Sequence, residues 1–93
     1  MITWTTATRD DGKAMHAAEI DYYRLQVFEG PHVYTWFAHV LRSRFDLEFT
    51  PFARDTAGSL KEAQLAALDA VCNDILTRKT RLIDEIFAYV RTL

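Results

Sequence analysis

The chain has 93 residues, a formal net charge of −2 at pH 7 and 49% hydrophobic residues, which is typical of one globular domain with a single core. The slightly acidic balance argues against a protein that binds nucleic acid mainly by neutralising phosphates. A single cysteine, Cys72, excludes an internal disulfide framework. There is no apolar run of transmembrane length and no signal-peptide pattern. We therefore expect one cytoplasmic domain over residues 1–93 that does not bind a membrane.

The first forty residues predict an antiparallel β-meander. A turn is expected at Asp10-Asp11-Gly12 and a second one at Glu29-Gly30-Pro31-His32, because Gly and Pro favour turn conformations. The segments between the turns are rich in β-branched and aromatic residues, although the alanines of residues 13–20 also fit a helix. The sheet is expected within residues 2–41. Its candidate strands are residues 2–8, 13–20, 22–28 and 33–41.

Residues 42–58 are expected to form an irregular connection. Residues 45–49 alternate apolar and acidic side chains and are a candidate short edge strand. Pro51 and the stretch 54–59 are expected to interrupt regular structure.

A helix is predicted to begin at Leu60, because Ser59 and Glu62 form a capping box directly before an apolar-periodic run. The apolar stripe keeps its phase to the end of the chain, and no Gly or Pro interrupts it. This favours one continuous helix over residues 60–92. The alternative is a break at residues 77–80, with a second helix folded back as a hairpin. Cys72 lies on the stripe and is expected to be a small buried residue.

A continuous helix of this length extends about 50 Å, whereas an eight-residue strand spans only about 27 Å. The helix therefore overshoots its sheet, and its distal half needs another partner for its apolar residues. A second copy of the same helix would provide one, so we expect a homodimer. Lys79 either sets the register of this interface or packs its stem while its ammonium stays in water. The expected dimer residues are Lys79, Leu82, Ile83, Ile86, Tyr89, Val90 and Leu93.

The central strands have two apolar faces. One face, with Tyr23, Leu25 and Val27 on one strand and Tyr34, Trp36, Ala38 and Val40 on the next, is expected beneath the helix. Exposed aromatics mixed with arginine are typical of protein-binding surfaces. The alternative is that residues 1–12, led by Trp4, cover the second face. The expected partner-binding residues on the second face are Tyr22, Arg24, Phe37 and His39, with Phe28 and Val33 beside them.

The residues that could carry chemistry are few. His16, His32 and His39 show no metal-ligand spacing, and there is no nucleophile elbow or glycine-rich phosphate loop. We therefore expect neither an enzyme nor a metal or other cofactor. Basic residues at Arg42 and Arg44 and at 78–81 could instead form a phosphate-binding patch beside the sheet aromatics.

A short meander followed by a helix that opens on SLKEAQLAAL resembles small bacterial and phage proteins with a Trp-containing sheet before such a helix. The layout also resembles the three-strand-plus-helix arrangement of AP2-type and integrase N-terminal DNA-binding domains. The resemblance covers roughly residues 13–76. It implies a sheet-plus-helix fold and assigns no functional residue.

These patterns together predict an α+β domain, with a three- or four-stranded antiparallel meander packed against a long C-terminal helix. The expected function is a small non-enzymatic protein-binding module, such as a regulator or inhibitor encoded by a phage or mobile element. The alternative is a nucleic-acid-binding domain that uses the outer sheet face with Arg24, Arg42 and Arg44.

Overall fold

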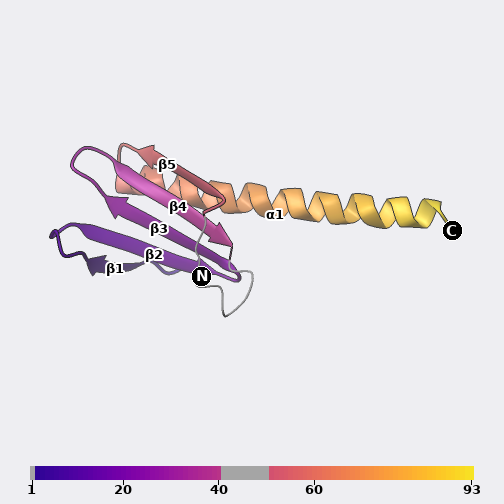
Figure 1. The fold of residues 1–93 in the computed structure, drawn as a ribbon, viewed down its shortest axis with the longest axis horizontal. Helices are drawn as coiled ribbons and strands as arrows, with labels where there is room; N and C mark the ends of the chain where they lie inside the picture. Colours follow the sequence, from indigo (N-terminus) through magenta and orange to yellow (C-terminus); the bar gives the residue numbers. More distant parts are fainter. Residues whose placement is uncertain (1, 41–50) are drawn as a thin grey trace.

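The computed structural model describes residues 2–40 and 51–93, which form an antiparallel sheet and one long helix (Figure 1). Within these residues the sheet has five strands in the order β1-β2-β3-β4-β5, so each strand pairs with its neighbours in the sequence. The elements are β1 (Thr5–Thr8), β2 (Ala14–Ile20), β3 (Tyr23–Glu29), β4 (Tyr34–Val40), β5 (Ala53–Ala57) and α1 (Leu60–Arg91).

The expected α+β fold is confirmed, but the expected three or four strands are too few. The additional strand, β5, lies inside the segment that was expected to be irregular, and it pairs with β4 from Ala38↔Ala53 to Tyr34↔Ala57. It was missed because it carries no large apolar residue. Its half-buried positions are alanines, and Arg54 and Asp55 between them are exposed, as is common on an edge strand. The candidate strand at residues 45–49 lies outside the described residues.

The core lies between α1 and one face of the sheet. Tyr23, Leu25 and Val27 of β3 and Trp36 and Ala38 of β4 are all buried and belong to one cluster with the helix. These residues alternate with side chains of the opposite face, as the two-residue period of a strand requires. The sequence-based assignment of the covered face is therefore confirmed.

The helix begins where the sequence predicts. The Ser59 hydroxyl accepts a hydrogen bond from the Glu62 backbone N–H at 3.2 Å, which satisfies one of the free donors of the first turn. From there α1 continues without interruption to Arg91. The alternative of a break at residues 77–80 is wrong, and the helix extends far beyond the sheet in Figure 1.

The side of the helix that packs on the sheet overlaps only in part with the predicted stripe, since Leu68 and Ile75 pack at the edge of the core. Ala63, Ala67 and Val71 are buried against the sheet, whereas Leu65 is 56% exposed. Cys72 is also exposed, so the expectation that it is a buried core residue is wrong. Small side chains bring the helix axis close to the sheet, and at about 100° per residue Leu65 lies on nearly the opposite side from Ala67.

A polar contact ties α1 to the sheet near the point where the helix leaves it. The Tyr23 hydroxyl donates to Asp74 Oδ2 at 2.6 Å, and Arg78 Nε lies 2.9 Å from the same oxygen. Burial, and then the hydrogen bond to Asp74, raise the pKa of Tyr23. This contact joins β3 to the fourth turn of the helix.

Within residues 2–40 and 51–93, no helical segment combines the length and the hydrophobicity that a membrane-spanning helix requires.

Candidate interaction surfaces

The distal helix, residues 76–93, presents an exposed apolar surface. Every residue from 76 to 93 is exposed, and the large apolar ones among them are between 51% and 87% exposed. Isolated apolar residues on a surface are ordinary, but a contiguous patch of this kind marks an interaction site. We call these residues the distal stripe. They are Leu76, Leu82, Ile83, Ile86, Phe87, Tyr89, Val90 and Leu93.

Most of the distal stripe lies on one side of the helix. Leu82, Ile86 and Leu93 are spaced by four and seven residues, so they fall within a narrow sector at about 100° per residue. Ile83 and Val90 widen this sector on one flank, and Tyr89 widens it on the other. Lys79 lies within the same sector and is exposed. The expected dimer residues therefore form one continuous surface.

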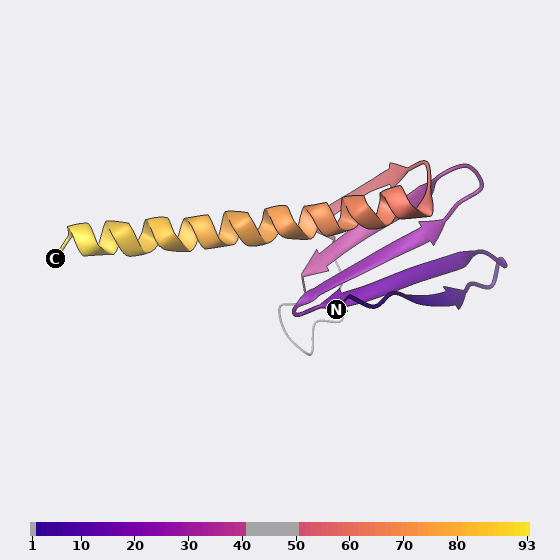
Figure 2. The ribbon, with the colours of Figure 1, turned by 180° about the vertical axis from the view of Figure 1, so that it is seen from behind.

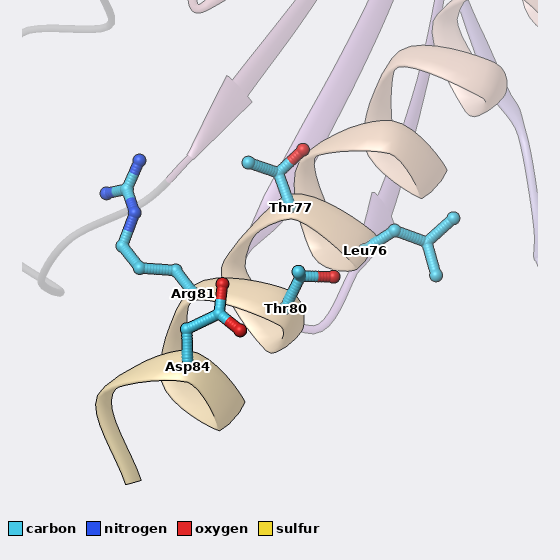
Figure 3. A pocket seen from close by; sticks show the side chains of 5 residues that line it. All are labelled: Leu76, Thr77, Thr80, Arg81 and Asp84. Carbon is cyan, nitrogen blue, oxygen red and sulfur yellow. The ribbon is translucent and has the colours of Figure 1, made fainter. Parts of the chain in front are cut away.

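The opposite side of the distal helix is mainly polar, and Leu76 lies at its border. A shallow hollow there is lined by Leu76, Thr77, Thr80, Arg81 and Asp84. Figure 3 shows that all five side chains project from the same helix and surround no enclosed space. A small-molecule site is normally a concave pocket that buries most of its ligand. This hollow is the solvated side of an amphipathic helix.

The outer face of the sheet carries a row of ring contacts. The Arg9 guanidinium lies 5.4 Å from the Phe28 ring centroid. Phe28 packs edge-on against Phe37 with 5.5 Å between the ring centroids. Phe37 stacks on His39 with 6.3 Å between the ring centroids. Arg9 also donates to the Glu29 carbonyl at 2.6 Å. Sequence reasoning missed Arg9, whose only signal was its position directly before the first turn.

The four partner-binding residues predicted for this face differ in their exposure and in their position on the sheet. Arg24 and Phe37 are half-buried on the outer face, and Arg24 forms an ion pair with Glu19 at 2.9 Å. His39 points to the same face but is only 4% exposed, so it offers a partner little contact area. Tyr22 lies in the turn between β2 and β3 and is 74% exposed.

The other residues that were predicted to lie on or over this face have the following positions. Val33 precedes β4 in the turn rather than lying on the sheet face. Trp4 packs against the core cluster on the helix side, so it does not cover the outer face as the alternative required. Arg42 and Arg44 lie outside the described residues. Of the three arginines predicted for nucleic-acid binding on this face, Arg24 alone lies within the described residues, and its guanidinium forms an ion pair with Glu19. The other predicted basic residues, at 78–81, lie on the distal helix and are exposed.

His39 makes the stability of the fold sensitive to acid. Burial, and then the positive charge of Arg24, lower the pKa of His39 below its ordinary value of 6.5. The unfolded chain therefore takes up a proton at higher pH than the folded chain. The stability that His39 contributes while it is neutral is fully present above about pH 6.5. It is lost as the pH falls toward the lower pKa that His39 has in the folded chain.

We expect the free energy of unfolding, measured in urea, to fall between pH 7.5 and 5.5. In His39→Gln this decrease should be smaller, because the replacement does not titrate. The matched control is His32→Gln, in the exposed turn before β4, which should retain the wild-type slope. An equal slope in all three proteins would contradict this role of His39.

Comparison of the chain with protein-family models, with curated proteins and with solved structures finds no match. The described residues contain no group of three or more His, Cys, Asp or Glu side chains that could hold a metal ion. What the protein does is therefore inferred from its own surfaces.

Proposed function

We propose that this protein is a small non-enzymatic protein-binding module that forms a homodimer through its distal helix. The observation that carries the proposal is the distal stripe, with eight large apolar side chains that are each at least half exposed. The opposite side of the helix is mainly polar, so the segment is amphipathic although every residue from 76 to 93 is exposed.

The energetics support association. Completing the burial of a half-exposed large apolar side chain contributes about 1 kcal/mol. Counted in both chains, the distal stripe supplies roughly 15 kcal/mol of gross stabilisation, whereas association costs about 4–15 kcal/mol. The gross gain therefore matches the upper end of this cost and exceeds the rest of the range, which favours association.

Within this proposal, the outer sheet face is a second surface for a different protein. The rings of Phe28 and Phe37 are half-buried there beside Arg9 and Arg24, a composition that is common in protein interfaces. A small dimer with a free outer face suits a regulator or inhibitor, the role that phages and mobile elements often give to short proteins. Its single thiol, Cys72, is compatible with the cytoplasm, where we place it.

The dimer is tested by sedimentation equilibrium over a range of concentrations. We expect the wild-type chain to approach twice its monomer mass, and Ile86→Asp to stay monomeric because a charge would be buried in the interface. The matched control is Ala88→Asp, which places the same charge on the exposed side of the helix nearly opposite Ile86 and should sediment like the wild type.

Circular dichroism shows whether each variant keeps its fold. Residue 86 lies in the exposed distal segment of α1, outside the core cluster, so the core should survive the substitution. A wild-type chain that sediments as a monomer at every concentration would overturn the proposal.

A further inference from the structure

The helix α1 has two parts that differ in what supports them. In the first part, side chains as far as Val71 are buried against the sheet, and the Tyr23 hydroxyl donates to Asp74 three residues later. Every residue from 76 to 93 is exposed, and Figure 2 shows this part of the helix continuing past the sheet with no other described element beside it. Tertiary packing therefore supports only the first part of α1.

The amino-acid composition of the helix changes at the same place. Residues 60–75 contain four alanines, whereas residues 76–91 contain one, Ala88, and alanine is the best helix former. Side chains of β-branched and aromatic type lose rotamer freedom against the preceding turn of a helix. Such side chains are frequent in the second part of α1, at Thr77, Thr80, Ile83, Ile86, Phe87, Tyr89 and Val90. Helix propensity is thus lowest where packing is absent.

Side-chain pairs along the helix do not replace the missing packing. Oppositely charged residues four positions apart stabilise an isolated helix, and the better order has the acid first. Arg78 pairs with Asp74 at 2.9 Å in this order, and it is the last ion pair along α1 in the part of the chain that the structure describes. Arg81 and Glu85 have the same spacing in the weaker order. The second part of α1 therefore has little support from its own residues.

We propose that residues 79–91 become helical when two chains associate and fray in the separate monomer, so that ordering of the helix is coupled to formation of the dimer. This inference rests on the proposed dimer and adds what controls it. Isolated helical segments shorter than about 12–15 residues are marginal in water even when they are rich in alanine. The contact of Tyr23 with Asp74 places the boundary, because it is the point at which the sheet stops holding the helix.

Coupling changes what determines the affinity of the dimer. Part of the free energy of association is used to order residues 79–91, so the dimer is weaker than its apolar surface alone would make it. In the frayed monomer the distal stripe is not a continuous surface, since its side chains share one side only when the segment is helical. A residue that does not touch the partner then changes the dissociation constant through its helix propensity alone.

The variants Arg81→Ala and Arg81→Gly test the coupling. At about 100° per residue Arg81 lies on the side of the helix opposite the distal stripe, and both variants remove the same charge. They differ in helix propensity, which favours alanine. Because each of the two chains orders its helix, we expect the dissociation constant of Arg81→Gly to be roughly 20-fold higher than that of Arg81→Ala. Sedimentation equilibrium over a dilution series measures both constants.

The matched control is the pair Gln64→Ala and Gln64→Gly. Gln64 lies in the part of α1 that packs on the sheet, so this position is helical in the monomer and in the dimer alike. The glycine variant should have a lower free energy of unfolding than the alanine variant, whereas the two dissociation constants should be equal.

Circular dichroism follows the ordering directly. As the wild-type dimer dissociates on dilution, the helical signal per residue should fall by about a third. The near-ultraviolet signal of Trp36, which is buried in the core, should stay constant. Ile86→Asp should show the lower helical signal at every concentration.

The outcomes separate the two proposals. A wild-type dimer for which Arg81→Ala and Arg81→Gly have equal dissociation constants overturns the coupling and leaves the dimer intact. A wild-type chain that is a monomer at every concentration overturns both proposals.

Discussion

Replacing Ala67 by leucine is expected to lower the free energy of unfolding by about 1–3 kcal/mol. Ala67 is completely buried between α1 and the sheet, and its methyl group allows the helix to lie close to Leu25 and Ala38. Three additional carbons at this position push the helix away from the sheet or force neighbouring side chains out of their preferred rotamers.

The matched control is Leu65→Ala, two residues earlier on the same helix. Leu65 is 56% exposed, so its truncation should change the free energy of unfolding by only about 0.5 kcal/mol. Both variants are measured by urea denaturation in the Ile86→Asp background, so that dissociation of a dimer does not enter the result. A larger loss for Leu65→Ala than for Ala67→Leu would mean that the helix packs on the sheet through its leucine side.

The second large effect is expected at the contact between Tyr23 and Asp74. Tyr23→Phe removes a hydroxyl that donates to a carboxylate at 2.6 Å, and hydrogen bonds to charged groups contribute about 1.5–3 kcal/mol. Because the Asp74 side chain is 23% exposed and keeps its ion pair with Arg78, we expect a loss of about 1–2 kcal/mol in the free energy of unfolding.

A double-mutant cycle with Asp74→Asn isolates the interaction. The effect of Tyr23→Phe should become smaller in the Asp74→Asn background, since the two changes remove the same contact. Tyr22→Phe is the control, because this neighbouring tyrosine lies in an exposed turn. Additive effects of Tyr23→Phe and Asp74→Asn would show that the contact does not stabilise the attachment of the helix.

The candidate interaction surface on the helix could be predicted from residue spacing, and the one on the sheet only in part. Ile86 and Leu93 recur with helical periodicity far beyond the length of a strand, so their exposure follows from the length of the helix. The alternation of side chains along β4 places His39 on the outer face, as predicted. It is nevertheless buried there, because alternation tells which face a side chain points to and not what covers it. The ring contact of Arg9 depends on the fold of the first turn, which local sequence does not reveal.

The elements that follow from local rules could be predicted from the order of the residues. The Ser59 cap, the unbroken stripe to the end of α1 and the two-residue alternation of β3 and β4 are all encoded within a few residues of one another, so the helix, the strands and the covered face could be deduced. The tertiary structure alone decided which interactions the short and small residues make. β5 is a strand because β4 offers it hydrogen-bond partners, and Ala63 and Ala67 face the core because close approach to the sheet favours the smallest side chains. Because the alanine side packs on the sheet, Leu65 and the distal stripe stay exposed, and packing of that kind is a property of the whole fold.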